Sequence, residues 1–166
     1  MDDHITLSLL VDNTSGVLSR IAGLFARRAY NIDSLTVGVT ANPLISRMTI
    51  VSRGDDNVLK QITAQLMKQE DVRDVKVLEP DNSVNRELIL VKVSADAKNR
   101  SDILSIANIF RANIIDVQKD SLIIELTGSQ PKLKAMLNML DGYQIAELAR
   151  TGITGLSRGL GDVRYL

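Results

Sequence analysis

The sequence predicts an α+β protein made of two consecutive units, each with the order strand, helix, strand, strand, helix, strand. Three observations predict it. Some segments alternate apolar and polar residues, as half-buried strands do, and others repeat apolar residues every three or four positions, as one face of a helix does. These two periods follow each other in the same order twice along the 166 residues. Two units of about eighty residues also fit the usual size of small domains.

In the first unit, alternation predicts strands over 5–11, 35–39, 47–51 and 72–77. Helical spacing predicts one helix from residue 17 to the Arg27-Arg28 pair and another over 58–66, capped by Asp55 or Asp56. The turn at 41–43 joins the two middle strands as a hairpin. This order is the ferredoxin-like arrangement, in which two helices cover one face of an antiparallel sheet.

The second unit repeats the pattern, with strands expected over 88–93, 114–117, 122–126 and 143–149 and helices over 103–110 and 133–140. A polar segment containing Pro80 interrupts the pattern between the units. We therefore expect domains at 1–79 and 86–166 with a linker at 80–85. The glycine-rich stretch 152–161 is either a frayed terminus or a tail that orders on a partner.

Composition excludes several classes of function. Twenty basic and twenty acidic residues give a formal net charge of zero, without a run of like charge, so neither nucleic acid nor an anionic membrane is an expected partner. The absence of cysteine excludes disulfides, thiolate metal sites and a thiol nucleophile. We expect a cytoplasmic protein, because no signal-like start or long apolar run is present. The single histidine, His4, is expected at the surface.

The turn at 12–16, between the first strand and the first helix, is the first candidate site. Gly16 would let a ligand approach closely, and the free N–H groups of the helix start would face a small anion. The same residues also fit a simple helix cap formed by Thr14 or Ser15. The corresponding turn of the second unit, 95–100, has no glycine, so we do not expect it to bind the same ligand.

A second candidate motif is 30–35, where the chain leaves the first helix; Asn31 could be a ligand contact or the C-cap of that helix. Asp12 and Asp33 could be proposed as an acid–base pair, but both residues also suit turns and caps, and no histidine, lysine or metal motif accompanies them. Catalysis is therefore not favoured. Arg20 and Arg47 are expected on a solvated helix face and on the polar side of a strand.

Four segments taken in order, 13–20, 23–28, 30–37 and 46–50, resemble the regulatory small subunit of acetolactate synthase, and the ending 156–159 is similar to that family as well. The resemblance covers essentially the whole chain and implies that the first unit is an ACT domain, an amino-acid-sensing module. It implies a protein without catalysis of its own that binds and activates the large catalytic subunit and confers feedback inhibition by valine. The thiamine diphosphate, magnesium and flavin of that chemistry belong to the large subunit, so we expect no cofactor here.

The resemblance also implies a homodimer, or a larger assembly, in which ACT domains pair edge to edge and hold the effector between them. By position, one protomer would supply Asn13 and the backbone of Gly16, Val17 and Leu18, and the other would supply Asn31 and Ile32. Helix-start N–H groups suit a carboxylate, and the amide oxygens of the two asparagines can accept from an ammonium group. An apolar wall is expected from Val17, Ile32 and Leu35. Discrimination among valine, leucine and isoleucine should be modest, because one methylene contributes only about 0.8 kcal/mol.

Two other classes of function remain open at this point. A free-standing ACT-type sensor would bind an amino acid and act on another protein partner, without stimulating any synthase. A small enzyme with a ferredoxin-like fold, such as an acyl phosphate hydrolase, would use residues 16–20 to cradle a phosphate group. The two readings differ in whether the isolated chain turns over acetyl phosphate.

Overall fold

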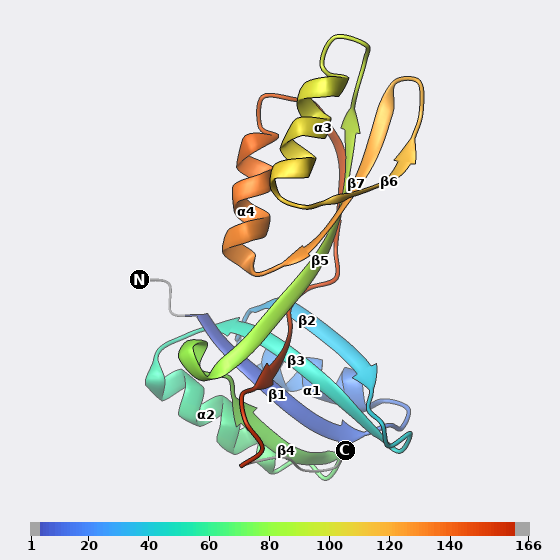
Figure 1. Cartoon of the computed structure of the whole chain (residues 1–166). Coiled ribbons are helices and arrows are strands. Elements are labelled where there is room, and N and C mark those ends of the chain that lie inside the picture. Colours follow the sequence, from blue (N-terminus) through green and yellow to red (C-terminus); the bar gives the residue numbers. More distant parts are fainter. Residues whose placement is uncertain (1–3, 162–166) are drawn as a thin grey trace. The chain divides into compact units, whose positions relative to one another are not determined.

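The computed structural model describes residues 4–161, and the chain divides into two compact units (Figure 1). Unit 1 contains residues 4–85 together with 153–161, and unit 2 contains 86–152. The division differs from the expected domains in two respects, because residues 80–85 and residues 153–161 both group with the first unit. The segment expected as a linker, 80–85, has regular secondary structure. It forms a 3₁₀ turn, Pro80–Asn82, and then the start of a strand that continues into unit 2, β5 (Ser83–Ser94).

Unit 1 contains a four-stranded antiparallel sheet with the order β2-β3-β1-β4. Its elements are β1 (His4–Asp12), α1 (Val17–Arg27), β2 (Ile32–Val39), β3 (Ile45–Arg53), α2 (Asp56–Met67) and β4 (Val72–Val77). This is the ferredoxin-like topology expected from the sequence. Of the two candidate caps of α2, the structure selects Asp55, whose carboxylate accepts from the backbone N–H groups of Asn57 and Val58, both at 2.9 Å.

The core of unit 1 lies between one face of the sheet and the two helices. Leu7 and Leu9 of β1 are fully buried and pair in register with Ile50 and Met48 of β3. The apolar stripes of α1 and α2 pack onto these strands through Ile21, Leu24, Phe25, Ile62 and Leu66. Burying one such side chain stabilises the fold by about 1.5–3 kcal/mol, so this layer fixes where both ends of α1 lie.

The opposite face of this sheet is covered by a strand that the sequence did not predict. β9 (Thr154–Ser157) pairs with β5, and Figure 1 shows it on the side of the sheet away from α1 and α2. Two residues beside or within it, Ile153 and Gly155, are buried. Both expectations for the stretch 152–161, a frayed terminus or a tail that orders on a partner, are therefore wrong for 153–157. This part of the chain is built into unit 1.

Unit 2 repeats the topology, with the sheet order β6-β7-β5-β8. Its further elements are α3 (Arg100–Ile109), β6 (Asn113–Val117), β7 (Ser121–Gly128), α4 (Gln130–Met139) and β8 (Ile145–Arg150). The repeat extends to the backbone after the first helix of each unit, where Ala29 and Arg111 adopt φ values of 55° and 56°. Within residues 4–161, no helix is both long enough and apolar enough to span a bilayer.

Candidate functional site

The first turn of α1 is open rather than capped. Its N-cap residue is Gly16, in the left-handed conformation with φ of 86°, and no side chain caps the helix. The expectation that Thr14 or Ser15 is the cap is therefore wrong. The first N–H groups of any helix have no partner within the helix, and the positive end of the helix dipole lies at the same place. This turn can therefore receive a small anion.

Asn13 is held against the turn between β2 and β3. Its backbone N–H donates to the carbonyl oxygen of Leu44 at 2.8 Å, and its side-chain Nδ2 donates to that of Pro43 at 2.9 Å. Because the amide nitrogen is used in this way, the side-chain oxygen is the atom left to accept a hydrogen bond. Asn13 therefore joins the open turn to the tip of the β2–β3 hairpin.

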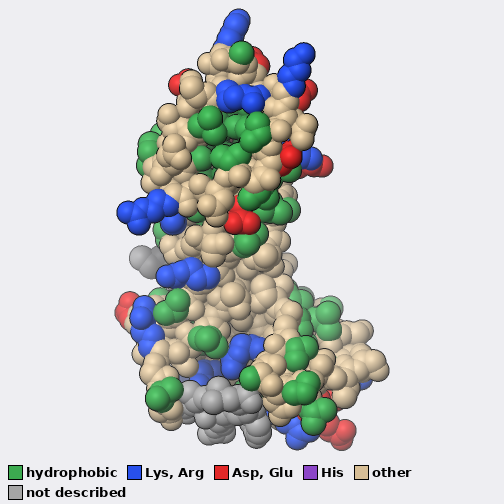
Figure 2. All heavy atoms as spheres, turned by 45° about the vertical axis from the view of Figure 1, so that its right-hand side comes forward, with side chains coloured by type: hydrophobic (Ala, Val, Ile, Leu, Met, Phe, Trp, Pro, Cys, Tyr) green, Lys and Arg blue, Asp and Glu red, His purple; other side chains and the backbone are tan. Residues whose placement is uncertain are grey.

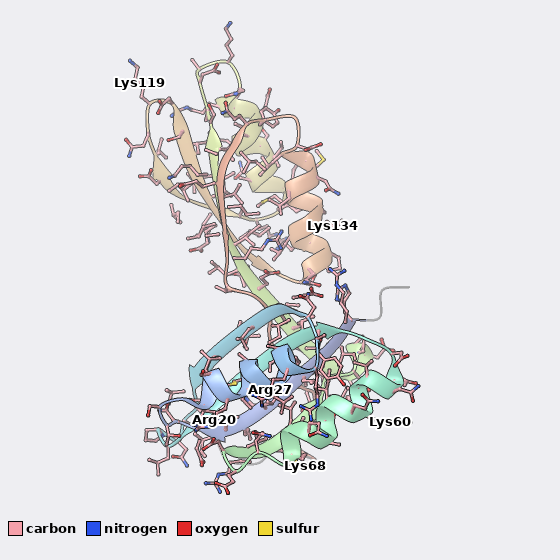
Figure 3. All side chains as sticks on the ribbon, turned by 180° about the vertical axis from the view of Figure 1, so that it is seen from behind. Arg20, Arg27, Lys60, Lys68, Lys119 and Lys134 are labelled. Atoms are coloured by element: carbon pink, nitrogen blue, oxygen red, sulfur yellow. The ribbon has the colours of Figure 1, made fainter. Side chains whose placement is uncertain are left out.

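Arg20 lies beside the same turn. This position was not predicted from the sequence. Its Nε donates to Asp71 Oδ2 at 2.6 Å, and its terminal Nη1 lies 2.9 Å from the position that a Cβ on Gly16 would occupy. Figure 3 labels Arg20 on α1. The sequence did contain the signal, since residues four apart on a helix lie on one face and Arg20 comes four after Gly16. A guanidinium group is thus placed next to the open N–H groups.

Val17 and Leu18 begin the helix but present different groups. The side chain of Val17 is buried in the core, so it does not form the apolar wall expected of it, and its backbone N–H is what it offers. Leu18 is 46% exposed and offers an apolar side chain beside the turn. Ile32 and Leu35 are half-buried and pack against the core of unit 1.

Asn31 and Ile32 lie at the far end of α1 from the open turn. Arg28, not Asn31, is the C-cap of the helix. The backbone oxygen of Asn31 accepts from Ser52 Oγ at 2.6 Å, and its Nδ2 donates to Asp33. Since α1 is 11 residues long, about 16 Å at 1.5 Å per residue separate the two groups of candidate residues. A single chain does not bring them together.

Asp33 is the centre of a small charged cluster next to Asn31. Arg53 Nε lies 2.8 Å from Asp33 Oδ2, and His4 Nδ1 lies 3.4 Å from the same oxygen. The hydrogen bond from Arg53 is the largest cause that lowers the pKa of the Asp33 carboxyl below its ordinary value. His4 is half-exposed, as expected from the sequence.

Asp12 and Asp33 do not form a pair. Asp12 accepts two hydrogen bonds from Arg73, at 2.6 and 2.8 Å, and lies at the end of β1, whereas Asp33 contacts His4 at its start. At about 3.4 Å per residue, roughly 27 Å of strand separates the two ends. Within residues 4–161, no group of three or more His, Cys, Asp or Glu side chains is arranged to hold a metal ion.

The lowered pKa of Asp33 leads to a prediction about stability. A carboxyl group with a lowered pKa in the folded state stabilises the fold above its unfolded pKa, near 3.9, and this contribution is lost as pH falls through the folded value. Asp33→Asn should therefore lower the free energy of unfolding at pH 7, by no more than about 1 kcal/mol because the pair with Arg53 is solvent-accessible. Thermal unfolding from pH 7 to pH 2.5 should show the difference shrinking. Glu70→Gln, at an exposed position, is the control, and a difference independent of pH would contradict the prediction.

The corresponding turn of unit 2 is already filled by its own carboxylate. Asp96 Oδ1 accepts from the backbone N–H groups of Lys98 and Asn99 at 2.8 and 3.0 Å, and Asn99 Oδ1 accepts from the N–H of Asp96. Arg100, at the start of α3, donates to the carbonyl oxygens of Ala95, Gln118 and Lys119. Neither helix has a side-chain cap, so the two turns differ in the residue three positions before the N-cap: Asp96 accepts from N–H groups of its own turn, whereas Asn13 donates to Pro43.

These features define a class. Two ferredoxin-like units in tandem, of which the first has an open helix start, an adjacent arginine and an asparagine fixed beside them, describe a regulatory protein of the ACT type. The comparisons with known proteins agree with this class. A family model described as "AHAS small subunit-like ACT domain" matches residues 7–74, and one described as "Small subunit of acetolactate synthase" matches residues 86–159.

The chain belongs to the acetolactate synthase small-subunit family. It is 52% identical over 159 residues to the "Probable acetolactate synthase small subunit" of Methanothermobacter thermautotrophicus. This alignment covers 95% of this chain and 94% of that protein. It is 49% identical to the small subunit of Mycolicibacterium smegmatis, over 93% and 91% of the two chains. The crystal structure of the small subunit from Thermotoga maritima matches with a TM-score of 0.89 and 41% identity, over 95% and 99% of the chains.

Membership of this family identifies the chain as a regulatory subunit in branched-chain amino acid biosynthesis and not as the catalytic subunit. It also implies a partnership with the large subunit of acetolactate synthase.

Proposed function

We propose that this protein binds valine at a site shared by two copies of the chain, activates the large subunit of acetolactate synthase, and transmits valine binding as feedback inhibition. The observation that carries the proposal is the turn before α1, compared with the turn before α3. Neither helix has a side-chain cap, but in unit 2 the carboxylate of Asp96 accepts from the N–H groups of Lys98 and Asn99, just before α3. Asn13, at the same place in unit 1, donates to Pro43 instead, and the turn with Gly16 and Arg20 has no such carboxylate folded onto it.

The charge arrangement supports an amino acid as the ligand. The N–H groups from Gly16 to Leu18 and the guanidinium of Arg20 suit a carboxylate. The side-chain oxygens of Asn13 and Asn31 suit an ammonium group, because the amide nitrogen of each already donates within the chain. The exposed side chain of Leu18 offers apolar contact for a branched side chain.

The strand register supports a site between two chains. β2 is an edge strand of the sheet, and edge strands can pair with a second copy. The open turn follows Asp12, which pairs with Ile45, at the end of the sheet where Val39 pairs with Ser46. If β2 strands of two copies pair antiparallel, the start of one strand lies at the end of the other. Asn31 and Ile32 of one copy then come to the same end of the joined sheet as the open turn of its partner.

Magnitudes make weak, reversible sensing feasible. A ligand of about eight non-hydrogen atoms has a ceiling near −12 kcal/mol at about −1.5 kcal/mol per atom. Sensing at roughly 0.1 mM requires only about −5.5 kcal/mol. Because a ligand that bridges two chains couples its binding free energy to the geometry of the pair, a catalytic subunit that binds the same pair can respond to it.

Two measurements on the native chain test the proposal. Isothermal titration with valine should give a dissociation constant within about tenfold of 0.1 mM, and isovalerate, which lacks the ammonium group, should bind much more weakly. Titration of the chain into purified large subunit should raise synthase activity, and valine should then reverse this rise. Valine binding without any effect on the synthase would indicate a sensor for another protein partner, and the absence of valine binding would refute the proposed site.

A further inference from the structure

Residues 153–158 contact the strands of unit 1 on the face opposite the helices. The N–H of Gly155 approaches Thr49 Oγ1 of β3 at 3.4 Å, and Ser157 Oγ lies 3.4 Å from the side-chain nitrogen of Lys76 on β4. The N–H of Arg158 donates to the carbonyl oxygen of Asn82 at 2.9 Å. The segment therefore crosses the sheet from its β2 edge to its β4 edge, with hydrogen bonds along its length.

The contact with β2 uses both backbone groups of one residue. The N–H of Ile153 donates to Ser34 Oγ at 2.8 Å, and its carbonyl oxygen accepts from Thr36 Oγ1 at 2.8 Å. Ile153 is only 5% exposed, so these two hydroxyl groups satisfy backbone atoms that water does not readily reach. Ser34 and Thr36 thus hold Ile153 at both of its backbone polar groups.

The segment packs closely against its neighbours at Gly155, where a side chain would not fit. A Cβ on Gly155 would lie 2.1 Å from Asn85 Oδ1 and 2.8 Å from Leu78 Cδ1. The close approach of the backbone at this point requires glycine. The position of Ile153 on β2 is therefore set by the contacts on both sides of it.

The connectivity of the chain gives this contact its importance. Unit 2 is inserted between residue 85 and residue 153 of unit 1, so the chain that returns from unit 2 reaches Ile153 first. Ser34 and Thr36 lie on β2, which begins at Ile32, directly after Asn31; Asn31 and Ile32 are the proposed effector residues of this part of the chain. A displacement of β2 by a ligand at Asn31 would move the point at which unit 2 is attached.

We propose that Ser34 and Thr36 are positioning residues that couple the effector site to unit 2 through the backbone of Ile153. This inference rests on the proposed function and specifies how the valine signal leaves the site. Coupling between distant sites requires an element whose arrangement both sites bias, and β2 carries both Ile32 and the two hydroxyl contacts to Ile153. The groups that touch the ligand are not themselves changed by removing the two hydroxyls.

The test separates binding of valine from its effect. The double variant Ser34→Ala/Thr36→Val should bind valine with a dissociation constant within about threefold of the native value and should still activate the large subunit, but its maximal inhibition by valine should fall by at least about half. The single variant Thr36→Ser keeps a hydroxyl group at position 36, so it should retain most of the native inhibition by valine. Thr63→Ala removes a hydroxyl whose bond to Leu59 is internal to α2, and it should behave like the native chain.

Hydrogen exchange gives an independent readout. Valine should change the exchange of the amide groups of 153–158 in the native chain, and this response should be lost in the double variant. Full inhibition of the double variant at the native valine concentration would overturn the inference, and so would a variant that no longer binds valine, since the hydroxyls would then belong to the site itself. A native chain that fails to bind valine would instead refute the proposed function.

Discussion

Gly16→Asp is expected to abolish inhibition by valine while activation of the large subunit persists. The introduced carboxylate would lie beside the open N–H groups and the guanidinium of Arg20, whose Nη1 is 2.9 Å from the position of the new Cβ. At the N-cap position it would compete with the ligand carboxylate for the N–H groups of the first turn of α1. Because hydrogen bonds to charged groups contribute about 1.5–3 kcal/mol, loss of the ligand carboxylate contacts should weaken valine binding by roughly 10- to 200-fold.

Gly16→Asn is the matched control for this experiment. Asparagine has the size of aspartate and tolerates a positive φ better than most residues, which matters at a position with φ of 86°. It carries no charge to compete with the ligand, so it should weaken valine binding less than aspartate does. Calorimetric titration and the reconstituted synthase assay would measure both variants. Native sensitivity of Gly16→Asp to valine would show that the carboxylate of the ligand binds elsewhere.

Charging the β2 edge is expected to separate the protomers and remove valine binding with them. Val37 and Val39 are 46% and 59% exposed on this edge strand, and hydrophobic side chains reach the surface on the β2 side of unit 1 in Figure 2. In Val37→Glu/Val39→Glu, antiparallel pairing with the start of one β2 at the end of the other would place the introduced carboxylates against the first residues of the partner strand, which include Ile32 and Asp33. Charges set against an apolar residue or beside another carboxylate on paired strands are destabilising. We expect a largely monomeric chain whose valine affinity falls at least about tenfold, since half of the site is then missing.

Sedimentation equilibrium and valine titration would measure the two effects together. Met67→Glu, at a position 53% exposed on α2, introduces a carboxylate into unit 1 away from the edge and should leave both the mass and the affinity unchanged. Circular dichroism should confirm that the double variant stays folded, because both valines are exposed in the single chain. A dimer that survives the two substitutions with native affinity would refute pairing through β2.

Local patterns in the sequence were sufficient to predict most of the fold. The alternation in β1 and the three- and four-residue spacing in α1 reflect which side of each element faces the core, and this property is written in adjacent residues. The same is true of Asp55, because a helix cap bonds to N–H groups only two and three residues away. The motifs that resemble the small subunit were also local, and the family comparisons confirmed them.

The candidate site was predicted only in part. Asn13 and Gly16 were named as candidates and lie at the open turn, but Thr14 and Ser15 are as acceptable in a cap as in an open turn, so the sequence could not decide between a cap and an open turn. Only the backbone conformation of Gly16 did so. Arg20 was placed on a solvated face because its partner, Asp71, is 51 residues away. Val17 was expected to line the site, but its direction depends on how α1 rotates against the sheet.

By itself, the sequence determined the two repeated units, the elements within them, the family and the residues around the open turn. The tertiary structure alone decided that residues 153–157 belong to unit 1 and that Ile153 is held by Ser34 and Thr36. The physical reason is the length and the partners of this segment. β9 has four residues, too few for a periodic pattern, and the two hydrogen bonds at Ile153 join residues 119 and 117 positions apart. Such contacts exist only once the sheet has formed a surface on which the returning chain can lie.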